Sequence, residues 1–303
     1  MADALNAAVA DAVANYYARR PAVTWLGRGL AAVQALRPAA ATRLAARLFF
    51  TPLPAKWRAA RAPVPPGWRV ESLAFERGRL ALFRPEADTA GPPVLLLHGW
   101  GGAAQQMLPI ARALAAAGAR PWLLDWPAHG RSSGWRASLP QFVRVLDYLL
   151  ARLADELGST PAVAAHSLGA LAAAAAAGRG APVSRLVLLA PSPPPEPVLR
   201  GFARGVGLDD AAQRRLRRHI EASEGLLLDG FEPQRLGQRL ALPTLIVHDR
   251  DDRMAPLEVS RRLAAHAAGA ELLVTESLGH LRLLEHAGVA ETVRDFVVRP
   301  RVL

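Results

Sequence analysis

The chain has 303 residues, of which 51% are hydrophobic and 21% are charged, and its formal net charge is +11. This length and composition favour one large globular domain over two and argue against disorder. The absence of cysteine excludes disulfides, thiolate zinc sites and a cysteine nucleophile, so any catalysis must use oxygen or nitrogen groups.

The excess positive charge is concentrated near the N-terminus. Between Asp11 and Glu71 there is no acidic residue, whereas ten basic residues lie there: Arg19, Arg20, Arg28, Arg37, Arg43, Arg47, Lys56, Arg58, Arg61 and Arg69. The rest of the chain is nearly balanced in charge. Because Lys56 is the only lysine, the abundance of arginine indicates a biased base composition of the genome as much as selection for an anionic partner. We therefore predict no nucleic-acid partner.

Residues 1–67 are predicted to form an N-terminal helical arm and a Pro-rich connector. Apolar residues such as Leu30 and Val33 recur at helical spacing, and Pro21 and Pro38 divide the arm into pieces. Two interpretations of the arm stay open. In the first, which the two prolines favour, the arm packs on the rest of the protein and its arginines face water. In the second, its apolar stripe and its arginines make peripheral contact with an anionic membrane.

No targeting or membrane-spanning segment is predicted. Asp3 and Asp11 interrupt the opening helical pattern, which is therefore unlike the basic region and apolar core of a signal peptide. The sequence also lacks the roughly 18 consecutive apolar residues of a spanning helix. We expect a cytoplasmic protein.

From residue 68 onward, short β-rich runs alternate with amphipathic segments. A hairpin and six buried runs give eight predicted strands: 68–75, 79–84, 94–98, 121–126, 162–166, 186–190, 244–248 and 271–275. Helical stretches are predicted between and after the later strands, near 103–117, 138–157, 168–178, 257–268 and 281–297. This order predicts an α/β fold with a mainly parallel eight-stranded sheet flanked by helices, and an active site at the carboxyl ends of the strands.

One connection is longer than a crossover needs. About fifty residues, 191–242, separate two of the strands and begin in a proline-rich run, and their middle part, 209–225, has helical character. Insertions of this length tend to be lids or binding elements. We predict a small helical lid inserted into a domain that spans 68–303.

A strand, a serine flanked by small residues and an Ala-rich helix follow one another within residues 162–178. The serine is Ser167, with Ala165 two residues before it and Gly169 two residues after it. Small residues at these places let strand and helix approach each other around a strained nucleophile turn. A helix N-cap would explain the serine alone but not the motifs that accompany it, so Ser167 is the candidate nucleophile.

A glycine-rich loop, His-Gly-Trp-Gly-Gly at 98–102, follows the strand at 94–98. It lacks both the spacing of a dinucleotide-binding motif and the lysine of a P-loop. Backbone N–H groups in such a loop can instead hold the oxyanion of a tetrahedral intermediate. We predict that the oxyanion donors are the N–H groups of Trp100 and of Leu168, the residue after the serine, and that His98 is structural.

A third block, Asp-x-Pro-x-His-Gly-x-Ser at 125–132, lies between these two motifs. In this order and with these separations, the three blocks resemble those of the α/β-hydrolase superfamily, and the likeness covers roughly residue 68 to the C-terminus. The resemblance implies the α/β-hydrolase fold and catalytic residues in the chain order serine, acid, histidine. It also implies that the third block is chiefly structural, so Asp125 and His129 are not expected to be catalytic.

The resemblance also selects the acid and the base. Asp249, Asp251 and Asp252 compete for the role of acid. In the family the acid stands four residues before the proline that opens the next helix, which here is Pro256 and selects Asp252. The other two are expected to be turn or capping residues. His280 follows the last strand in a Gly-His pair that resembles the family's terminal loop, so it is the expected base.

We therefore expect a serine hydrolase that cleaves a small-molecule carboxylic ester of short to medium acyl chain through a Ser-His-Asp triad and an acyl-enzyme, with no metal or organic cofactor. The small lid and the apolar Trp100, Trp126 and Trp135 near the expected site favour an acyl chain of short to medium length. The alternatives are a thioesterase or another acyl hydrolase of the same fold, or a membrane- or partner-binding scaffold that uses the basic arm. The sequence does not define the oligomeric state.

Overall fold

The computed structural model describes residues 2–18, 21–52, 55–87, 90–225 and 227–299. They form two compact units. The first, called here the helical unit, comprises Met1–Thr51 and Pro193–Glu232, and the second, called the sheet unit, comprises Pro52–Ser192 and Pro233–Leu303. Most of the expected arm and most of the expected lid therefore belong to one unit. Arg19 and Arg20 of the basic segment lie outside the described residues.

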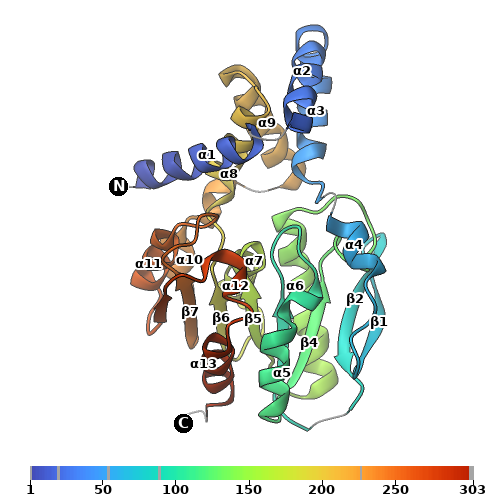
Figure 1. Ribbon diagram of the computed structural model, residues 1–303, viewed down its shortest axis with the longest axis vertical. Coiled ribbons are helices and arrows are strands. Elements are labelled where there is room, and N and C mark those ends of the chain that lie inside the picture. Colours follow the sequence, from blue (N-terminus) through green and yellow to red (C-terminus); the bar gives the residue numbers. More distant parts are fainter. Residues whose placement is uncertain (1, 19–20, 53–54, 88–89, 226, 300–303) are drawn as a thin grey trace. The chain divides into compact units, whose positions relative to one another are not determined.

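The sheet unit contains one sheet of eight strands in the order β1-β2-β4-β3-β5-β6-β7-β8 (Figure 1). The strands are β1 (Trp68–Phe75), β2 (Gly78–Pro85), β3 (Pro93–Leu97), β4 (Arg120–Asp125), β5 (Ala162–His166), β6 (Leu186–Leu189), β7 (Thr244–Asp249) and β8 (Glu271–Thr275). β2 is antiparallel to β1 and β4, and all other pairs are parallel. The predicted sheet is confirmed, and each strand ends within one residue of its expected bounds.

Helices cover both faces of this sheet. The helices of the sheet unit are α4 (Ala55–Arg61), η1 (Ala104–Met107), α5 (Leu108–Ala116), α6 (Leu139–Leu157), α7 (Leu168–Ala177), α10 (Pro233–Gly237), α11 (Leu257–His266), α12 (Gly279–Arg282) and α13 (Ala287–Val298). Val94 and Leu96 of β3 share a core with Phe296 of α13. Because side chains alternate along a strand, Leu95 and Leu97 face the opposite layer, and they too are fully buried. Burial on both faces explains why these strands were visible as unbroken apolar runs.

Two helical predictions need correction. The helix expected at 281–297 is two helices, α12 and α13, because His286 has extended backbone and forms the N-cap of α13. The last proline of the proline-rich start of the insertion begins α8 (Pro195–Gly205), a helix that was not predicted. Pro195 occupies the first position of α8, where proline is tolerated because that N–H has no helical partner.

The helical unit consists of α1 (Ala2–Ala18), α2 (Pro21–Leu36), α3 (Pro38–Phe49), α8, α9 (Asp210–Glu224) and η2 (Leu228–Phe231). Pro21 and Pro38 each begin a helix, as the prediction that they divide the arm requires. The unit has its own core, in which Leu30 and Phe50 pack with Phe202 from the second chain segment. This core unites segments about 150 residues apart in the sequence.

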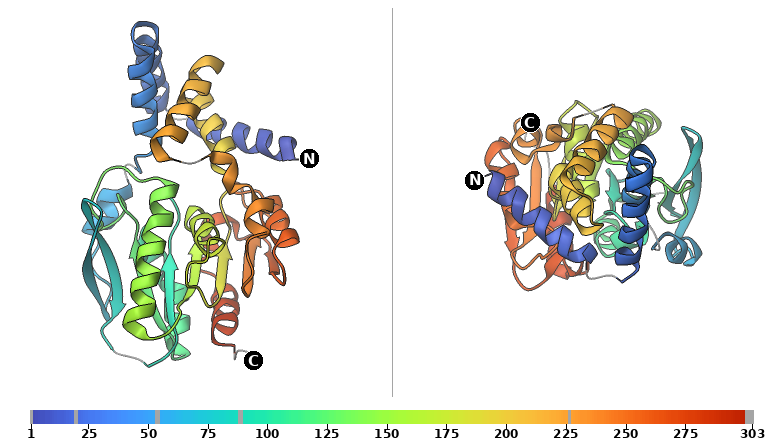
Figure 2. Two further views of the ribbon diagram at one scale, coloured as in Figure 1. Left: turned by 180° about the vertical axis from the view of Figure 1, so that it is seen from behind. Right: turned by 90° about the horizontal axis from the view of Figure 1, so that it is seen from above.

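Glycines allow α1 and α8 to pack closely (Figure 2). A Cβ atom added at Gly201 would lie 2.5 Å from the carbonyl oxygen of Ala10, and one added at Gly205 would lie 2.7 Å from Cβ of Tyr17. Both distances are shorter than a van der Waals contact, so any larger residue would push the helices apart.

Candidate active site

Ser167 occupies a strained turn between β5 and α7. Its backbone angles are φ 54° and ψ −120°, a conformation that non-glycine residues rarely adopt and that costs about 1–3 kcal/mol. The neighbouring strand fixes the turn, because the Ser167 N–H donates to the carbonyl of Leu189 at 2.9 Å. Gly169 is required at its position, since a Cβ there would lie 2.5 Å from the His98 carbonyl oxygen. The fully buried Ala165 shows that a methyl group is accepted on the other side of the serine.

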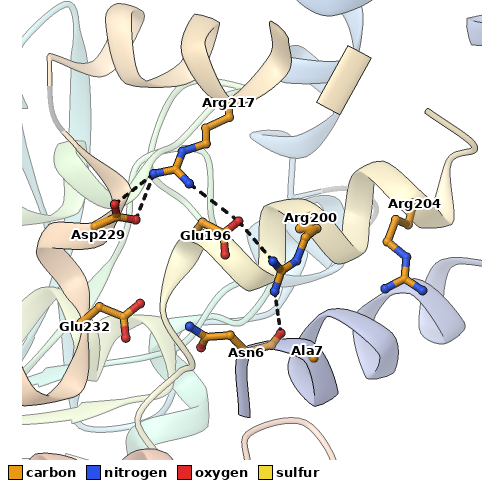
Figure 3. Close-up of a pocket in the computed structure, with 8 residues that line it drawn as sticks. All are labelled: Asn6, Ala7, Glu196, Arg200, Arg204, Arg217, Asp229 and Glu232. Carbon is orange, nitrogen blue, oxygen red and sulfur yellow. Dashed lines mark hydrogen bonds and ion pairs between the residues drawn. The ribbon is translucent and has the colours of Figure 1, made fainter. Parts of the chain in front are cut away.

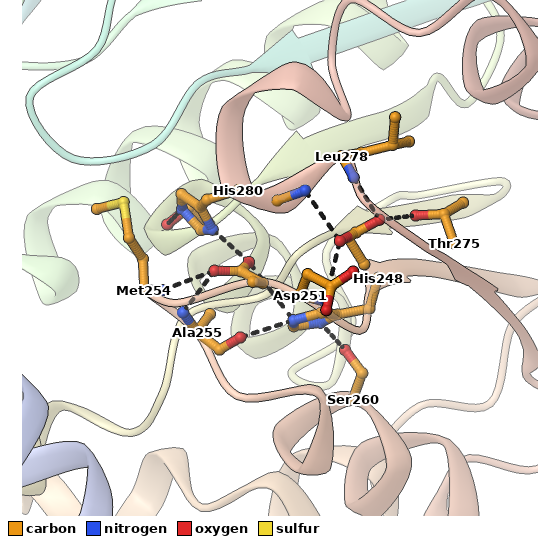
Figure 4. A network of polar contacts seen from close by, with 12 residues as sticks. His248, Asp251, Met254, Ala255, Ser260, Thr275, Leu278 and His280 are labelled. Atoms are coloured by element: carbon orange, nitrogen blue, oxygen red, sulfur yellow. Dashed lines mark hydrogen bonds and ion pairs between the residues drawn. The ribbon is translucent and has the colours of Figure 1, made fainter.

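The structure brings Ser167, His280 and Asp252 together in one chain of hydrogen bonds. His280 Nε2 lies 3.0 Å from Ser167 Oγ. On the other side of the ring, His280 Nδ1 lies 2.6 Å from Asp252 Oδ2, within the network of polar contacts drawn in Figure 4. Because the carboxylate only accepts, Nδ1 carries the proton and Nε2 is free to accept the hydroxyl proton of Ser167. The arrangement has the geometry of a nucleophile, a base and a group that orients the base.

The surroundings of Asp252 keep its carboxyl group ionised. Its side chain is fully buried, and its second oxygen accepts the N–H groups of Met254 at 2.7 Å and of Ala255 at 2.9 Å. Burial by itself would raise the pKa of Asp252, but the hydrogen bond and charge of His280 and these two N–H groups outweigh it, so the pKa lies below its usual value.

The two competing acids brace the loop that leads to His280. Asp251 accepts the N–H of Ser277 at 2.8 Å. Asp249 accepts three hydrogen bonds from the same region: Thr275 Oγ1 at 2.8 Å, Leu278 N at 3.0 Å and Gly279 N at 2.9 Å. Burial would raise the pKa of Asp249, but these bonds lower it below its usual value. This link across two loops was not predicted, although the cluster of acids after β7 was visible.

Two further histidines support the site, and the sequence assigned no such role to either. His248 lies between Ser260 Oγ at 2.6 Å and the Ala255 carbonyl at 2.8 Å, so it fastens the loop that contains Asp252. His166 donates from Nε2 to the carbonyl of His280 at 3.0 Å. Burial, and next the proximity of His280, lower the pKa of His166 to about 3. It is therefore neutral at ordinary pH and acts as a fixed donor to the histidine loop.

The glycine-rich loop lies directly against the serine. A Cβ added at Gly99 would be 2.8 Å from Cβ of Ser167, so Trp100 follows a residue in contact with the nucleophile. Leu168 is the first residue of α7, and the first N–H groups of a helix have no partner within it. The two predicted oxyanion donors thus belong to segments that flank Ser167.

The third sequence block holds this loop in place. His129 Nε2 accepts the N–H of Gly101 at 3.0 Å, which leaves its Nδ1–H to donate to the Pro127 carbonyl. Asp125 accepts the N–H of Ala104 at 2.8 Å. Burial lowers the pKa of His129 to about 3 and raises that of Asp125. Neither side chain is hydrogen-bonded to Ser167 or His280, in keeping with the expected structural role.

Within the described ranges, no group of three or more His, Asp or Glu side chains is arranged to hold a metal ion. In the same part of the chain, no helix combines the length and apolar character needed to cross a bilayer.

Comparison with known proteins gives the family. The family model described as alpha/beta hydrolase fold matches residues 92–242, which include Ser167 but end before Asp252 and His280. A curated relative, the 2-hydroxy-6-oxononadienedioate/2-hydroxy-6-oxononatrienedioate hydrolase of Paraburkholderia xenovorans, is 37% identical over 91 residues, which are 26% of this chain. The match spans only 31% of that relative's length.

Solved structures share the fold over most of the chain. Est1E from Butyrivibrio proteoclasticus, solved with ferulic acid bound, is 20% identical with a TM-score of 0.59, and the likeness covers 75% of this chain and 97% of that one. The Pyrococcus furiosus esterase Pf2001 is 18% identical with a TM-score of 0.58, over 77% and 92% of the two chains. These likenesses show the fold alone. The match to the family model shows that this chain belongs to the α/β-hydrolase superfamily.

Proposed function

We propose that the protein is a serine hydrolase that cleaves a carboxylic ester of short to medium acyl chain. The observation that carries the proposal is the continuous chain of hydrogen bonds from Ser167 Oγ through His280 to the buried Asp252. Ser167 is the nucleophile, His280 the general base, and Asp252 the group that fixes the tautomer of the histidine.

In the first half of the reaction, Ser167 Oγ attacks the ester carbonyl carbon while its proton passes to His280 Nε2. The oxyanion is held by the N–H groups of Trp100 and Leu168. Asp252 stabilises the imidazolium, which then protonates the departing alcohol. In the second half, a water molecule gives its proton to His280 and attacks the acyl-enzyme, and collapse of the second tetrahedral intermediate returns the proton to Ser167 and releases the acid.

A panel of p-nitrophenyl esters of increasing chain length tests this proposal. The unchanged protein should hydrolyse the shorter esters. Ser167→Ala should retain only the residual activity that the oxyanion hole and substrate binding supply, about 10³–10⁴-fold above the uncatalysed reaction in water. A fluorophosphonate probe should label the protein once and fail to label Ser167→Ala. Labelling of that variant, or inactivity of the unchanged protein on every ester, would contradict the proposal.

A second candidate is hydrolysis of another acyl or carbon–carbon bond by the same residues. It is favoured by the short match to the Paraburkholderia xenovorans hydrolase, whose name describes an oxo-dienedioate substrate. Thioesters and a vinylogous 1,5-diketone added to the ester panel distinguish these reactions by their kcat/KM values.

The expected cytoplasmic location stays a prediction.

A further inference from the structure

Helix α2 has two apolar faces, and only one of them packs into the core of the helical unit. Leu30 is fully buried and Val33 is packed against the core of the helical unit. On the opposite side, four exposed residues separated by four, three and four positions share one face: Trp25, Gly29, Ala32 and Leu36. Trp25 is 69% exposed and Leu36 is 84% exposed. An apolar stripe on a helix normally packs against another apolar surface, and the outer stripe of α2 has no such partner among the described residues of the helical unit.

The groups around this face are cationic. Arg28, the only charged residue of α2, has its guanidinium 4.9 Å from the centre of the Trp25 ring. Helix α3 packs along α2 and exposes Arg43 and Leu44, and the exposed Arg37 joins the two helices. We call the residues Trp25, Arg28, Leu36, Arg37, Arg43 and Leu44 the hairpin surface.

No carboxylate belongs to the hairpin surface. The sequence has no acidic residue from 12 to 70. Asp209, from the second chain segment, accepts a hydrogen bond from Gln34 at 2.8 Å. Gln34 follows Trp25 by nine residues, which are about two and a half helical turns, so it lies on the opposite side of α2. Asp11 is paired with Arg204 at 2.6 Å. Within residues 21–49, which form α2, α3 and the turn between them, every charged side chain is therefore an arginine.

We propose that the hairpin surface docks the protein on an anionic membrane. In this arrangement α2 lies in the plane of the interface, Trp25 and Leu36 enter the boundary between headgroups and acyl chains, and the arginines meet the lipid phosphates. A second copy of the chain fits this surface poorly, because it would bring arginines against arginines without a carboxylate to neutralise them. The proposal does not depend on the proposed hydrolase activity.

Co-sedimentation of the full chain with vesicles tests the proposal. Vesicles of phosphatidylglycerol and phosphatidylcholine in equal parts should carry the protein into the pellet at low salt, and vesicles of phosphatidylcholine alone should not. Since each cation near the surface contributes about 1 kcal/mol, Arg28→Gln with Arg43→Gln should weaken binding about thirtyfold. Trp25→Ser with Leu36→Ser should also release the protein, and both changes lie on exposed positions where folding does not depend on the side chain.

Matched controls separate docking from general loss of charge or apolar surface. Arg77→Gln with Arg112→Gln removes two exposed charges of the sheet unit, and Trp135→Ser with Leu227→Ser removes an exposed tryptophan and leucine elsewhere. Both control variants should bind like the unchanged protein, and so should Ser167→Ala. The proposal is wrong if the unchanged protein stays in the supernatant, if the controls lose as much binding as the hairpin variants, or if Trp25→Ser with Leu36→Ser dissolves a dimer without affecting sedimentation.

Discussion

The loops after β7 and β8 and the surface of the helical unit are both rich in charged residues, but they use these residues differently. In the loops, the buried side chains of Asp249 and Asp252 each accept at least three hydrogen bonds. In the helical unit, charged residues form ion pairs around an open pocket, as Arg217 does with Asp229 at 3.0 Å (Figure 3).

The difference lies in what replaces a lost partner. A buried acceptor that loses its donor cannot turn to water, so its full desolvation cost appears. An exposed arginine that loses its carboxylate is solvated again at little cost. Substitutions in the two regions should therefore differ greatly in effect, although both remove one hydrogen-bonded charge.

The largest effect is expected at Asp252. Replacing it by Asn leaves the shape but removes the charge that fixes the His280 tautomer, so kcat should fall about 10³–10⁴-fold. Asp251→Asn changes the neighbouring acid, which is exposed and braces only the Ser277 N–H. It should cost no more than about tenfold, the equivalent of one hydrogen bond. Steady-state kinetics on the best p-nitrophenyl ester compares the two, and a reversed ranking would move the role of acid from Asp252 to Asp251.

A large effect on stability is expected from the buried histidines of the sheet unit. Burial lowers the pKa of His98 to about 4 and those of His129 and His166 to about 3, and it also lowers that of His248. These groups are neutral when folded but take up a proton near pH 6.5 when unfolded. Their contribution to stability is therefore complete above about pH 6.5 and is lost as the pH falls toward their folded pKa values. Asp125, whose pKa is raised by burial, opposes part of this loss.

Urea unfolding followed by tryptophan fluorescence measures this effect, because six of the seven tryptophans belong to the sheet unit. Each histidine that takes up a proton should add a slope of about 1.4 kcal/mol per pH unit to the free energy of unfolding between about pH 4 and 6.5. His129→Gln should reduce the slope by about that amount. Equal slopes in the unchanged protein and in His129→Gln would mean that His129 is not held neutral by burial.

A smaller effect is expected where the helical unit is itself tightly packed. The methyl group of Gly201→Ala would meet the backbone of Ala10, which cannot move aside without shifting α1. The substitution should destabilise the unit by about 1–3 kcal/mol. Gly29→Ala is the matched control, because nothing lies within 4 Å of the added Cβ and alanine favours the helix by about 0.5–1 kcal/mol. Thermal unfolding followed by circular dichroism should therefore move in opposite directions for the two variants, and a neutral Gly201→Ala would show that α1 and α8 are looser in solution.

The same contrast explains what the sequence could predict. The strands and the residues that follow them were predicted closely, because burial on both faces leaves unbroken apolar runs and the nucleophile turn admits few residue types. The bracing by Asp249 and His248 was not predicted, since it depends on which backbone groups approach across separate loops. The shared helical unit was not predicted for a similar reason. The surfaces of α1 and α8 that pack together are about 190 residues apart, and the apolar pattern of one helix does not indicate that the other is its partner.

The smallest effect is expected for the ion pair of Asp11 and Arg204. The nitrogen–oxygen distance is 2.6 Å, but the two side chains are 58% and 48% exposed. Because water and salt screen such a pair, the coupling in a double-mutant cycle of Asp11→Asn and Arg204→Gln should be about 0.2–1 kcal/mol and should shrink further at high salt. Urea unfolding of the four proteins measures it. A coupling above about 2 kcal/mol that persists in salt would require a desolvated pair, and the surface of the helical unit would then resemble the buried loops rather than contrast with them.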